Sequence, residues 1–169
     1  MKLKTPLRYP GGKSRAVPKL LQWLPSRKIT EYREPFLGGG SMAIEMTRRL
    51  PEEVPIWVND LYEPLYNFWI QLRDNGDYLH SELMRAKNFH PDEDSARELF
   101  LESKENLNDS KRSQEDRAVD FYIINKCSFS GLTESSSFSK AASNSNFSHR
   151  GIERLPEYSK LISRWKITN

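Results

Sequence analysis

The sequence predicts an α/β protein that carries a mostly helical insertion. Residues 32–37 form a short apolar segment that runs into three consecutive glycines and then into a helical pattern. Residues 55–58 form a second such segment, which ends at Asn59 and Asp60 before the next helical pattern begins. Strands that alternate with helices are typical of the α/β class, whereas residues 64–108 are helical in pattern and acidic throughout.

Length and composition indicate one domain, or one domain carrying an insertion, since 169 residues with 37% apolar side chains can build a real core. The tryptophan and phenylalanine content excludes a disordered chain. Cys127 is the one cysteine, so a disulfide framework is impossible and a reducing compartment is expected. No apolar run reaches membrane length and residues 1–4 lead into no signal core, so we expect a soluble, cytoplasmic protein without a membrane partner.

Charge is distributed unevenly along the chain, although the net charge is only +3. Residues 1–50 hold eleven Lys or Arg against three Glu, residues 51–120 hold eight against seventeen acids, and residues 121–169 hold seven against three. Two basic ends around an acidic middle are compatible with a nucleic-acid partner on one face. An ordinary solvated surface gives the same totals, so both interpretations stay open.

The amino-terminal residues 6–13 form a tight basic turn that carries Tyr9 and Lys13 four residues apart. A helix over residues 14–24 is expected to follow, because apolar residues recur there at helical spacing and should face the core. These residues are Val17, Leu20, Leu21 and Leu24. A Gly-Lys-Ser tripeptide overlaps the turn, but a nucleoside-triphosphate loop needs glycine where Leu7 stands, so that interpretation is rejected.

The glycine turn after the first strand is the strongest candidate for a binding site. Gly38 and Gly40 let the backbone approach a ligand closely, and the helix predicted from Ser41 to Leu50 offers its free amides and positive dipole end to a carboxylate or phosphate. Together with Ala43 these glycines also fit the G-x-G-x-x-A pattern of dinucleotide sites. The turn alone therefore does not choose between a nicotinamide, a flavin and S-adenosylmethionine, and a plain glycine-rich loop is the remaining alternative.

Asp60 ends the second predicted strand. An acid at this position accepts hydrogen bonds from ribose hydroxyls in α/β nucleotide-binding folds. The alternative is that Asp60 caps the helix that starts near Glu63.

Two apolar stripes on the predicted helices of 64–108 are interpreted as core packing without chemistry. They consist of Leu65, Phe68, Trp69 and Leu72, and of Leu99, Phe100 and Leu107. A further helix beginning near Ser113 should bury Val119, Tyr122 and Ile123 with the stem of Lys126.

A serine-rich stretch runs from about residue 128 to 148, after the segment Asn125–Leu132. Long loops of this composition are either functional surface loops, whose hydroxyls and aromatic rings suit phosphates and base edges, or disordered linkers. Both remain open. A last amphipathic helix is expected to carry Leu155, Leu161, Ile162 and Trp165.

Taken together, several motifs resemble the Dam-type DNA adenine-N6 methyltransferases in order and spacing, from about residue 5 to the end. The motifs are Tyr9-Pro10-Gly11-Gly12-Lys13, Glu34-Pro35-Phe36-Leu37-Gly38-Gly39-Gly40-Ser41, Asn59-Asp60, Asn125-Lys126-Cys127-Ser128-Phe129-Ser130-Gly131-Leu132 and the region of Phe147. The resemblance implies a Rossmann-like, S-adenosylmethionine-dependent methyltransferase sheet interrupted by a helical DNA-recognition part. We expect a cofactor-binding part at 1–63, a DNA-recognition part at 64–155 and a returning helix at 156–169.

The resemblance also implies a set of cofactor-binding residues. Lys13 suits the methionine carboxylate, Asp60 the ribose hydroxyls, and the glycine turn cradles the methionine half. The full set is Tyr9, Lys13, Glu34, Phe36, Gly38, Gly40, Ser41 and Asp60.

For double-stranded DNA, the resemblance implies a hairpin from Phe129 to Thr133 that enters the duplex beside the target adenine, with Lys126 near the backbone. The predicted DNA-binding residues are Lys126, Phe129, Ser130, Gly131, Leu132, Thr133 and Glu134. The family usually has a basic residue for reading guanine where Glu134 stands. Because a carboxylate accepts from a cytosine amino group instead, the GATC target of the family is not transferred.

The family's catalytic D-P-P-Y tetrapeptide positions the flipped adenine, and it does not occur here because no two prolines are adjacent. The sequence stops where the strand before that motif would be expected to begin. We therefore assign no catalytic residue and no metal ligand, and expect an amino-terminal portion that is inactive unless a continuation or a second chain supplies the motif. The alternatives are a non-catalytic cofactor- or DNA-binding remnant and an oxidoreductase; Pro35 in the first strand disfavours the latter.

Overall fold

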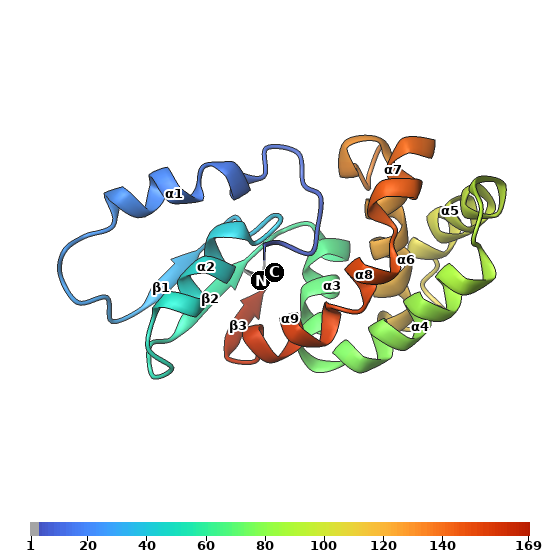
Figure 1. Cartoon of the computed structure of the whole chain (residues 1–169). Helices are drawn as coiled ribbons and strands as arrows, with labels where there is room; N and C mark the ends of the chain where they lie inside the picture. Colours follow the sequence, from blue (N-terminus) through green and yellow to red (C-terminus); the bar gives the residue numbers. More distant parts are fainter. Residues whose placement is uncertain (1–3) are drawn as a thin grey trace.

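The computed structural model describes residues 4–169 and has a small sheet on one side of the molecule and a group of helices on the other (Figure 1). Residues 1–3, part of the predicted segment 1–63, lie outside the described residues. The sheet has three parallel strands in the order β1-β2-β3, namely β1 (Tyr32–Glu34), β2 (Ile56–Asn59) and β3 (Trp165–Thr168). The predicted α/β class is therefore confirmed.

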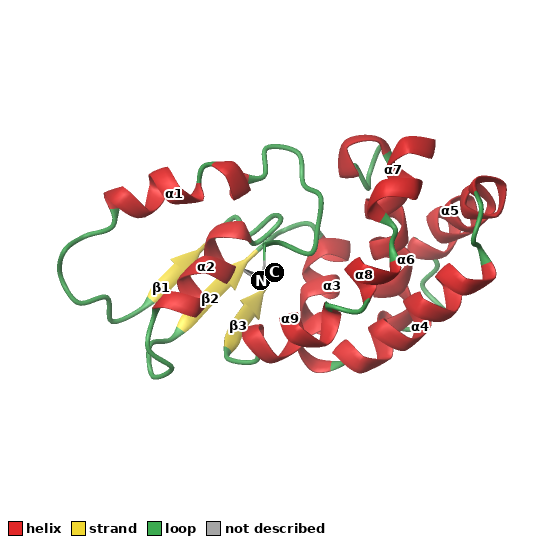
Figure 2. Cartoon of the chain, viewed as in Figure 1, coloured by secondary structure: helices red, strands yellow, loops and turns green. Residues whose placement is uncertain are grey.

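In sequence order, some helices come before β2 and the others come between β2 and β3 (Figure 2). α2 (Ser41–Arg49) joins β1 to β2, within one residue of the prediction. Between β2 and β3 come α3 (Glu63–Asp74), α4 (Gly76–Phe89), α5 (Glu93–Leu107), α6 (Gln114–Cys127), α7 (Lys140–Asn146), α8 (His149–Ile152) and α9 (Leu155–Ile162). Because the strands are parallel, the carboxyl ends of β1, β2 and β3 lie at one edge of the sheet.

The predicted helical stretch 64–108 is confirmed, but it is divided into three helices. Asn75 separates α3 from α4, and Asp92 caps α5 by accepting a hydrogen bond from the Ser95 amide at 3.0 Å. Ser113 caps α6 in the same way through the Asp116 amide. All the apolar residues predicted to form the core of this stretch and of α6 are buried: Leu65, Phe68, Trp69, Leu72, Leu99, Phe100, Leu107, Val119, Tyr122 and Ile123.

The main hydrophobic core is continuous from the sheet to the helices, and α3 connects the two. The ring of Trp69 lies 5.4 Å from that of Trp165 in β3, and the ring of Phe68 lies 5.5 Å from that of Phe121 in α6. Side chains from β2, β3 and α3 to α6 belong to one buried cluster. Residues on both sides of position 63 therefore fold around the same core.

The amino-terminal segment does not form the single helix predicted over 14–24. It forms the 3₁₀ turn η1 (Lys13–Arg15), the short α1 (Val17–Leu20) and the 3₁₀ turn η2 (Leu21–Trp23). Of the four apolar residues expected to face the core, only Val17 is buried, against Met42 and Met46 of α2. So little apolar burial does not stabilise a longer regular helix.

The carboxyl-terminal prediction needs one correction. Trp165 does not lie in the last helix: α9 ends at Ile162, and Trp165 begins β3. Residues 156–169 are thus not only a returning helix, because they include a strand paired with β2. Burial alternates along its four residues, which is too short a pattern for helix and strand periodicity to be told apart in the sequence.

The serine-rich stretch is ordered. Ser139 and Ser148 cap α7 and α8, and Phe147 is fully buried. The predicted hairpin at Phe129–Thr133 is instead the 3₁₀ turn η3 (Phe129–Gly131), closed behind by an antiparallel bridge between Ser128 and Phe138. Two serines of this stretch thus serve as helix caps.

Arg164 fixes α2 against the carboxyl-terminal strand. Its guanidinium donates hydrogen bonds to the carbonyl oxygens of Thr47, Leu50, Pro51, Glu52 and Val54, which lie at the end of α2 and in the turn before β2. Over residues 4–169, no helix combines the length and apolarity needed to cross a membrane.

Candidate functional site

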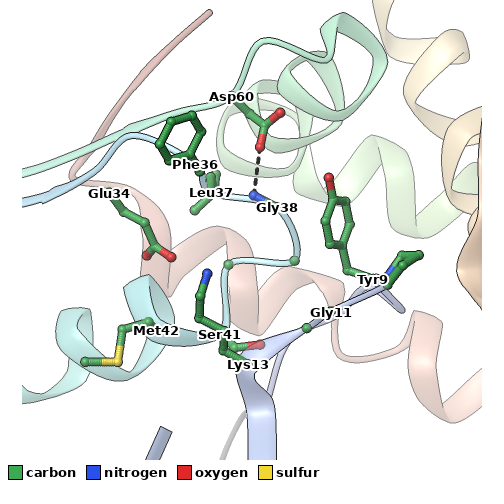
Figure 3. Close-up of a pocket in the computed structure, with 14 residues that line it drawn as sticks. Tyr9, Gly11, Lys13, Glu34, Phe36, Leu37, Gly38, Ser41, Met42 and Asp60 are labelled. Atoms are coloured by element: carbon green, nitrogen blue, oxygen red, sulfur yellow. Dashed lines mark hydrogen bonds between the residues drawn. The ribbon is translucent and has the colours of Figure 1, made fainter. Parts of the chain in front are cut away.

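A cavity of about 310 Å³ lies at the carboxyl ends of β1 and β2. Residues from three separate segments line it: residues 9–13, Glu34 with residues 36–42, and Asp60 (Figure 3). All eight predicted cofactor residues are among them: Tyr9, Lys13, Glu34, Phe36, Gly38, Gly40, Ser41 and Asp60. The structure therefore brings the whole predicted set together in one pocket.

The glycine turn has the backbone conformation and close packing that only glycine allows. Gly38 has φ +51° and Gly40 has φ +66°. A Cβ at Gly38 would lie 2.9 Å from the Tyr9 ring, and one at Gly40 would lie 2.8 Å from the Trp69 ring. The indole of Trp69 also donates a hydrogen bond to the Gly38 carbonyl at 3.1 Å, so a side chain of α3 holds the turn in place.

Asp60 holds two backbone segments together. One carboxylate oxygen accepts from the Gly38 amide at 2.8 Å (Figure 3). The other accepts from the Tyr62 amide at 3.1 Å. The residue at the cap position of α3 is Tyr62, so Asp60 is not the helix cap that the sequence left open. Each carboxylate oxygen has a second lone pair, which leaves acceptor capacity for a ligand hydroxyl.

The charges of the pocket are of both signs. In Figure 3 the Lys13 side chain extends toward Glu34, and Asp60 lies at the far wall. Burial raises the pKa of Glu34, opposed by the hydrogen bond from the Tyr32 hydroxyl at 3.0 Å and by the charge of Lys13. Burial and the charges of Asp60 and Glu134 raise the pKa of Tyr9. This arrangement suits a ligand that carries both an anionic and a cationic group.

The amino-terminal turn is tied to α2 as well as to the glycines. The hydroxyls of Ser14 and Ser41 lie 2.8 Å apart, and a Cβ at Gly39 would lie 3.0 Å from Cβ of Tyr9. Met42 also lines the pocket, although nothing in the sequence marks it except its place in the first turn of α2. Within residues 4–169, no group of three or more His, Cys, Asp or Glu is arranged to hold a metal ion.

Most of the predicted DNA-binding residues lie beside this pocket. Gly131, Leu132, Thr133 and Glu134 line a second cavity of about 310 Å³, together with Tyr9, Pro10, Tyr62 and Ser135. Phe129 is 64% exposed, and Ser130 has φ +54°, so the tip of the loop presents an aromatic side chain to solvent. Tyr62 was not selected from the sequence, although its position two residues after Asp60 places it at the same sheet edge.

Lys126 lies apart from those exposed residues. It is 9% exposed, its ammonium donates a hydrogen bond to the carbonyl oxygen of Pro6, and it lies 5.0 Å from the centre of the Tyr122 ring. Burial lowers its pKa to about 8. Its predicted place near the DNA backbone stays a prediction, while its contact to the amino-terminal segment is a direct observation.

Comparison with known proteins gives the family of this chain. The family model for D12 class N6 adenine-specific DNA methyltransferases matches residues 9–169. The chain belongs to this family. The match begins at Tyr9 and covers every motif that lines the two cavities, which confirms the resemblance noted in the sequence.

Two curated relatives of this D12-class chain are both named Type II methyltransferases. It is 26% identical over 140 residues to the Type II methyltransferase M.MjaIII of Methanocaldococcus jannaschii, which covers 78% of this chain and 48% of the relative. It is 29% identical over 128 residues to the Type II methyltransferase M1.LlaDCHI of Lactococcus lactis subsp. cremoris, which covers 74% of this chain and 41% of the relative. The matched region thus spans less than half of each relative.

Proposed function

We propose that this chain binds S-adenosylmethionine in the cavity at the ends of β1 and β2 and forms the cofactor-binding and DNA-recognition part of a DNA adenine-N6 methyltransferase. The observation that carries the proposal is the convergence of eight residues, chosen from three separate motifs, on one pocket. The family supports the reaction, and both relatives are named Type II methyltransferases, which supports a place in a restriction-modification system.

The pocket fits the charges of this cofactor. Its methionine part carries a carboxylate and an ammonium group, which match the Lys13 ammonium and the Glu34 carboxylate. Its ribose hydroxyls match the free lone pairs of Asp60, and such charge-assisted hydrogen bonds contribute about 1.5–3 kcal/mol each. Phe36, 77% exposed beside the pocket, offers an apolar surface to the adenine ring. When bound, the cofactor supplies the methyl group.

The topology supports the same placement. In Rossmann-like sheets the order 3-2-1 forms one half, and ligands bind outside the carboxyl ends of the strands next to strand 1. The order β1-β2-β3 corresponds to that half, and the cavity lies next to β1 and the turn that follows it. We therefore assign residues 1–63 together with β3 to the cofactor-binding part. Helices α3 to α8 are assigned to the DNA-recognition part.

For DNA, the proposal places the turn at Phe129–Gly131 and the residues up to Glu134 against the duplex. Methylation of an adenine amino group requires the base to leave the stack and its amino group to be held by acceptors. The family's D-P-P-Y acceptors are not in this sequence. We propose that a further polypeptide segment supplies them; a module that binds cofactor and DNA without methylating is the second candidate, favoured by the same observation.

Isothermal calorimetry with S-adenosylhomocysteine and NAD tests the cofactor assignment. We expect S-adenosylhomocysteine to bind and NAD not to bind. Lys13→Ala should weaken binding of S-adenosylhomocysteine at least tenfold, because it removes the proposed partner of the ligand's carboxylate. Lys19→Ala is the matched control, because Lys19 is also exposed but lies outside the pocket. Tighter binding of NAD, or equal affinities of both variants, contradicts the proposal.

A further inference from the structure

Asn125, near the end of α6, connects the two cavities. It is 1% exposed, and its amide group makes three hydrogen bonds. Its oxygen accepts from the Arg8 backbone amide at 3.0 Å, and its nitrogen donates to the carbonyl oxygens of Arg8 at 2.6 Å and of Gly131 at 3.0 Å. One side chain thus joins residue 8, next to the first cavity, to residue 131, in the wall of the second.

Direct contacts surround this junction. The Arg8 guanidinium donates to the Ser128 carbonyl at 2.8 Å, and the buried Lys126 donates to the Pro6 carbonyl. Gly131 has φ +75°, and a Cβ there would lie 2.6 Å from both Cβ and the carbonyl oxygen of Arg8. The loop backbone at Gly131 therefore packs directly on Arg8, without space for a side chain between them.

The connection through Asn125 and Arg8 continues to Tyr9 in the wall of the first cavity. Tyr9 follows Arg8 directly, packs on Gly38 and Gly39, and lines both cavities. A ligand that fixes Tyr9 and Lys13 restricts the backbone of Arg8, and Asn125 and Gly131 are bonded to or packed on that backbone. The physical path from one cavity to the other is only a few residues long.

We propose that Asn125 is a positioning residue that couples the loop at 128–135 to the pocket at the glycine turn, so that a ligand in the pocket orders the loop. This inference rests on the proposed function for the identity of both sites. Coupling of this kind is a free energy between two sites, and ordering by one ligand lowers the entropic cost of binding the second. The loop would then be ready for DNA when the cofactor is bound.

Hydrogen–deuterium exchange of the 128–135 region, with and without saturating S-adenosylhomocysteine, tests the coupling. In the unmodified protein we expect the ligand to slow exchange of these amides by about fivefold or more. Asn125→Asp keeps the size and the acceptor but loses both donated hydrogen bonds, so the loop should no longer respond. Asn67→Asp is the matched control, since Asn67 is also buried and donates to the Gln114 carbonyl at 2.7 Å, away from the loop.

A second variant covers the case in which Asn125→Asp does not fold. Gly131→Ala pushes the loop away from Arg8 and leaves Asn125 in place, and it should also abolish the response. A loop that still responds in Asn125→Asp or Gly131→Ala overturns the proposal, as does an unchanged loop in the unmodified protein with ligand bound. Failure of S-adenosylhomocysteine to bind the unmodified protein, measured by calorimetry, instead contradicts the proposed function and removes the basis of this inference with it.

Discussion

Asp60 and Gly38 are joined by a hydrogen bond of 2.8 Å from the Gly38 amide to the Asp60 carboxylate. The acid that directly follows β2 therefore fixes the turn that follows β1, in addition to the ligand role predicted for it. Substitutions at this position affect both the shape of the pocket and its chemistry, and experiments have to separate the two.

Asp60→Ala removes the acceptor of two backbone amides and the proposed partner of the ribose. We expect loss of measurable S-adenosylhomocysteine binding and a decrease of about 1–3 kcal/mol in the free energy of unfolding, because the amides of Gly38 and Tyr62 lose their partner. Calorimetry and urea denaturation measure the two effects, and circular dichroism should show the helices intact. An unchanged dissociation constant would refute the ribose assignment.

Gly40→Ala tests the packing of the glycine turn. It combines a left-handed backbone, at φ +66°, with a Cβ 2.8 Å from the buried Trp69 ring, so we expect a loss of about 2–4 kcal/mol in unfolding free energy. Gly11→Ala is the control, because Gly11 has φ +72° and open space around it, and it should lose only about 1 kcal/mol. Equal losses in urea denaturation would show that contact with Trp69 is not what demands glycine.

Arg164→Lys tests the connection between α2 and the carboxyl-terminal strand. A lysine cannot reproduce the planar fork that donates to five carbonyl oxygens, so we expect about 2–3 kcal/mol of destabilisation. Arg27→Lys, at an exposed position, should change stability by less than about 0.5 kcal/mol. The comparison fails if both variants unfold at the same urea concentration.

Lys126 gives a pH dependence that can be measured. Burial lowers its pKa in the folded protein from the ordinary 10.5 to about 8, so between these values the unfolded chain binds more protons than the folded one. Stability due to this group therefore rises as pH increases from about 8 to about 10.5. Relative to Lys126→Met, the unmodified protein should gain stability over pH 8–10 in urea denaturation, and a constant difference would contradict the lowered pKa.

The pocket could be predicted from the sequence because its chemistry is carried by short, local motifs. A glycine turn between a strand and a helix, and an acid after the next strand, each specify their own backbone, and parallel strands then bring their ends together. Gly38, Gly40 and Asp60 meet as expected for this reason. The apolar stripes of α3 and α5 could also be predicted from the sequence, because their helical periodicity extends over several turns.

Other features depend on partners that are distant in the sequence. β3 has only four residues, and its pairing partner Ile56 is more than a hundred positions from Trp165, so nothing local marks it as a strand. The role of Asn125 likewise follows from its contact with Arg8, 117 positions away. The segment after Lys13 has helical spacing, yet it lacks a surface on which to bury Leu20.

Trp69 belongs to the sheet and to the helices at once, since it supports the glycine turn and packs on Trp165 while its helix adjoins α6. A chimera between two members of the D12 class should therefore keep α3 with its own sheet and join foreign sequence only beyond α3. A chimera cut at residue 63 would pair the indole of Trp69 with a foreign glycine turn in place of the one that it contacts here.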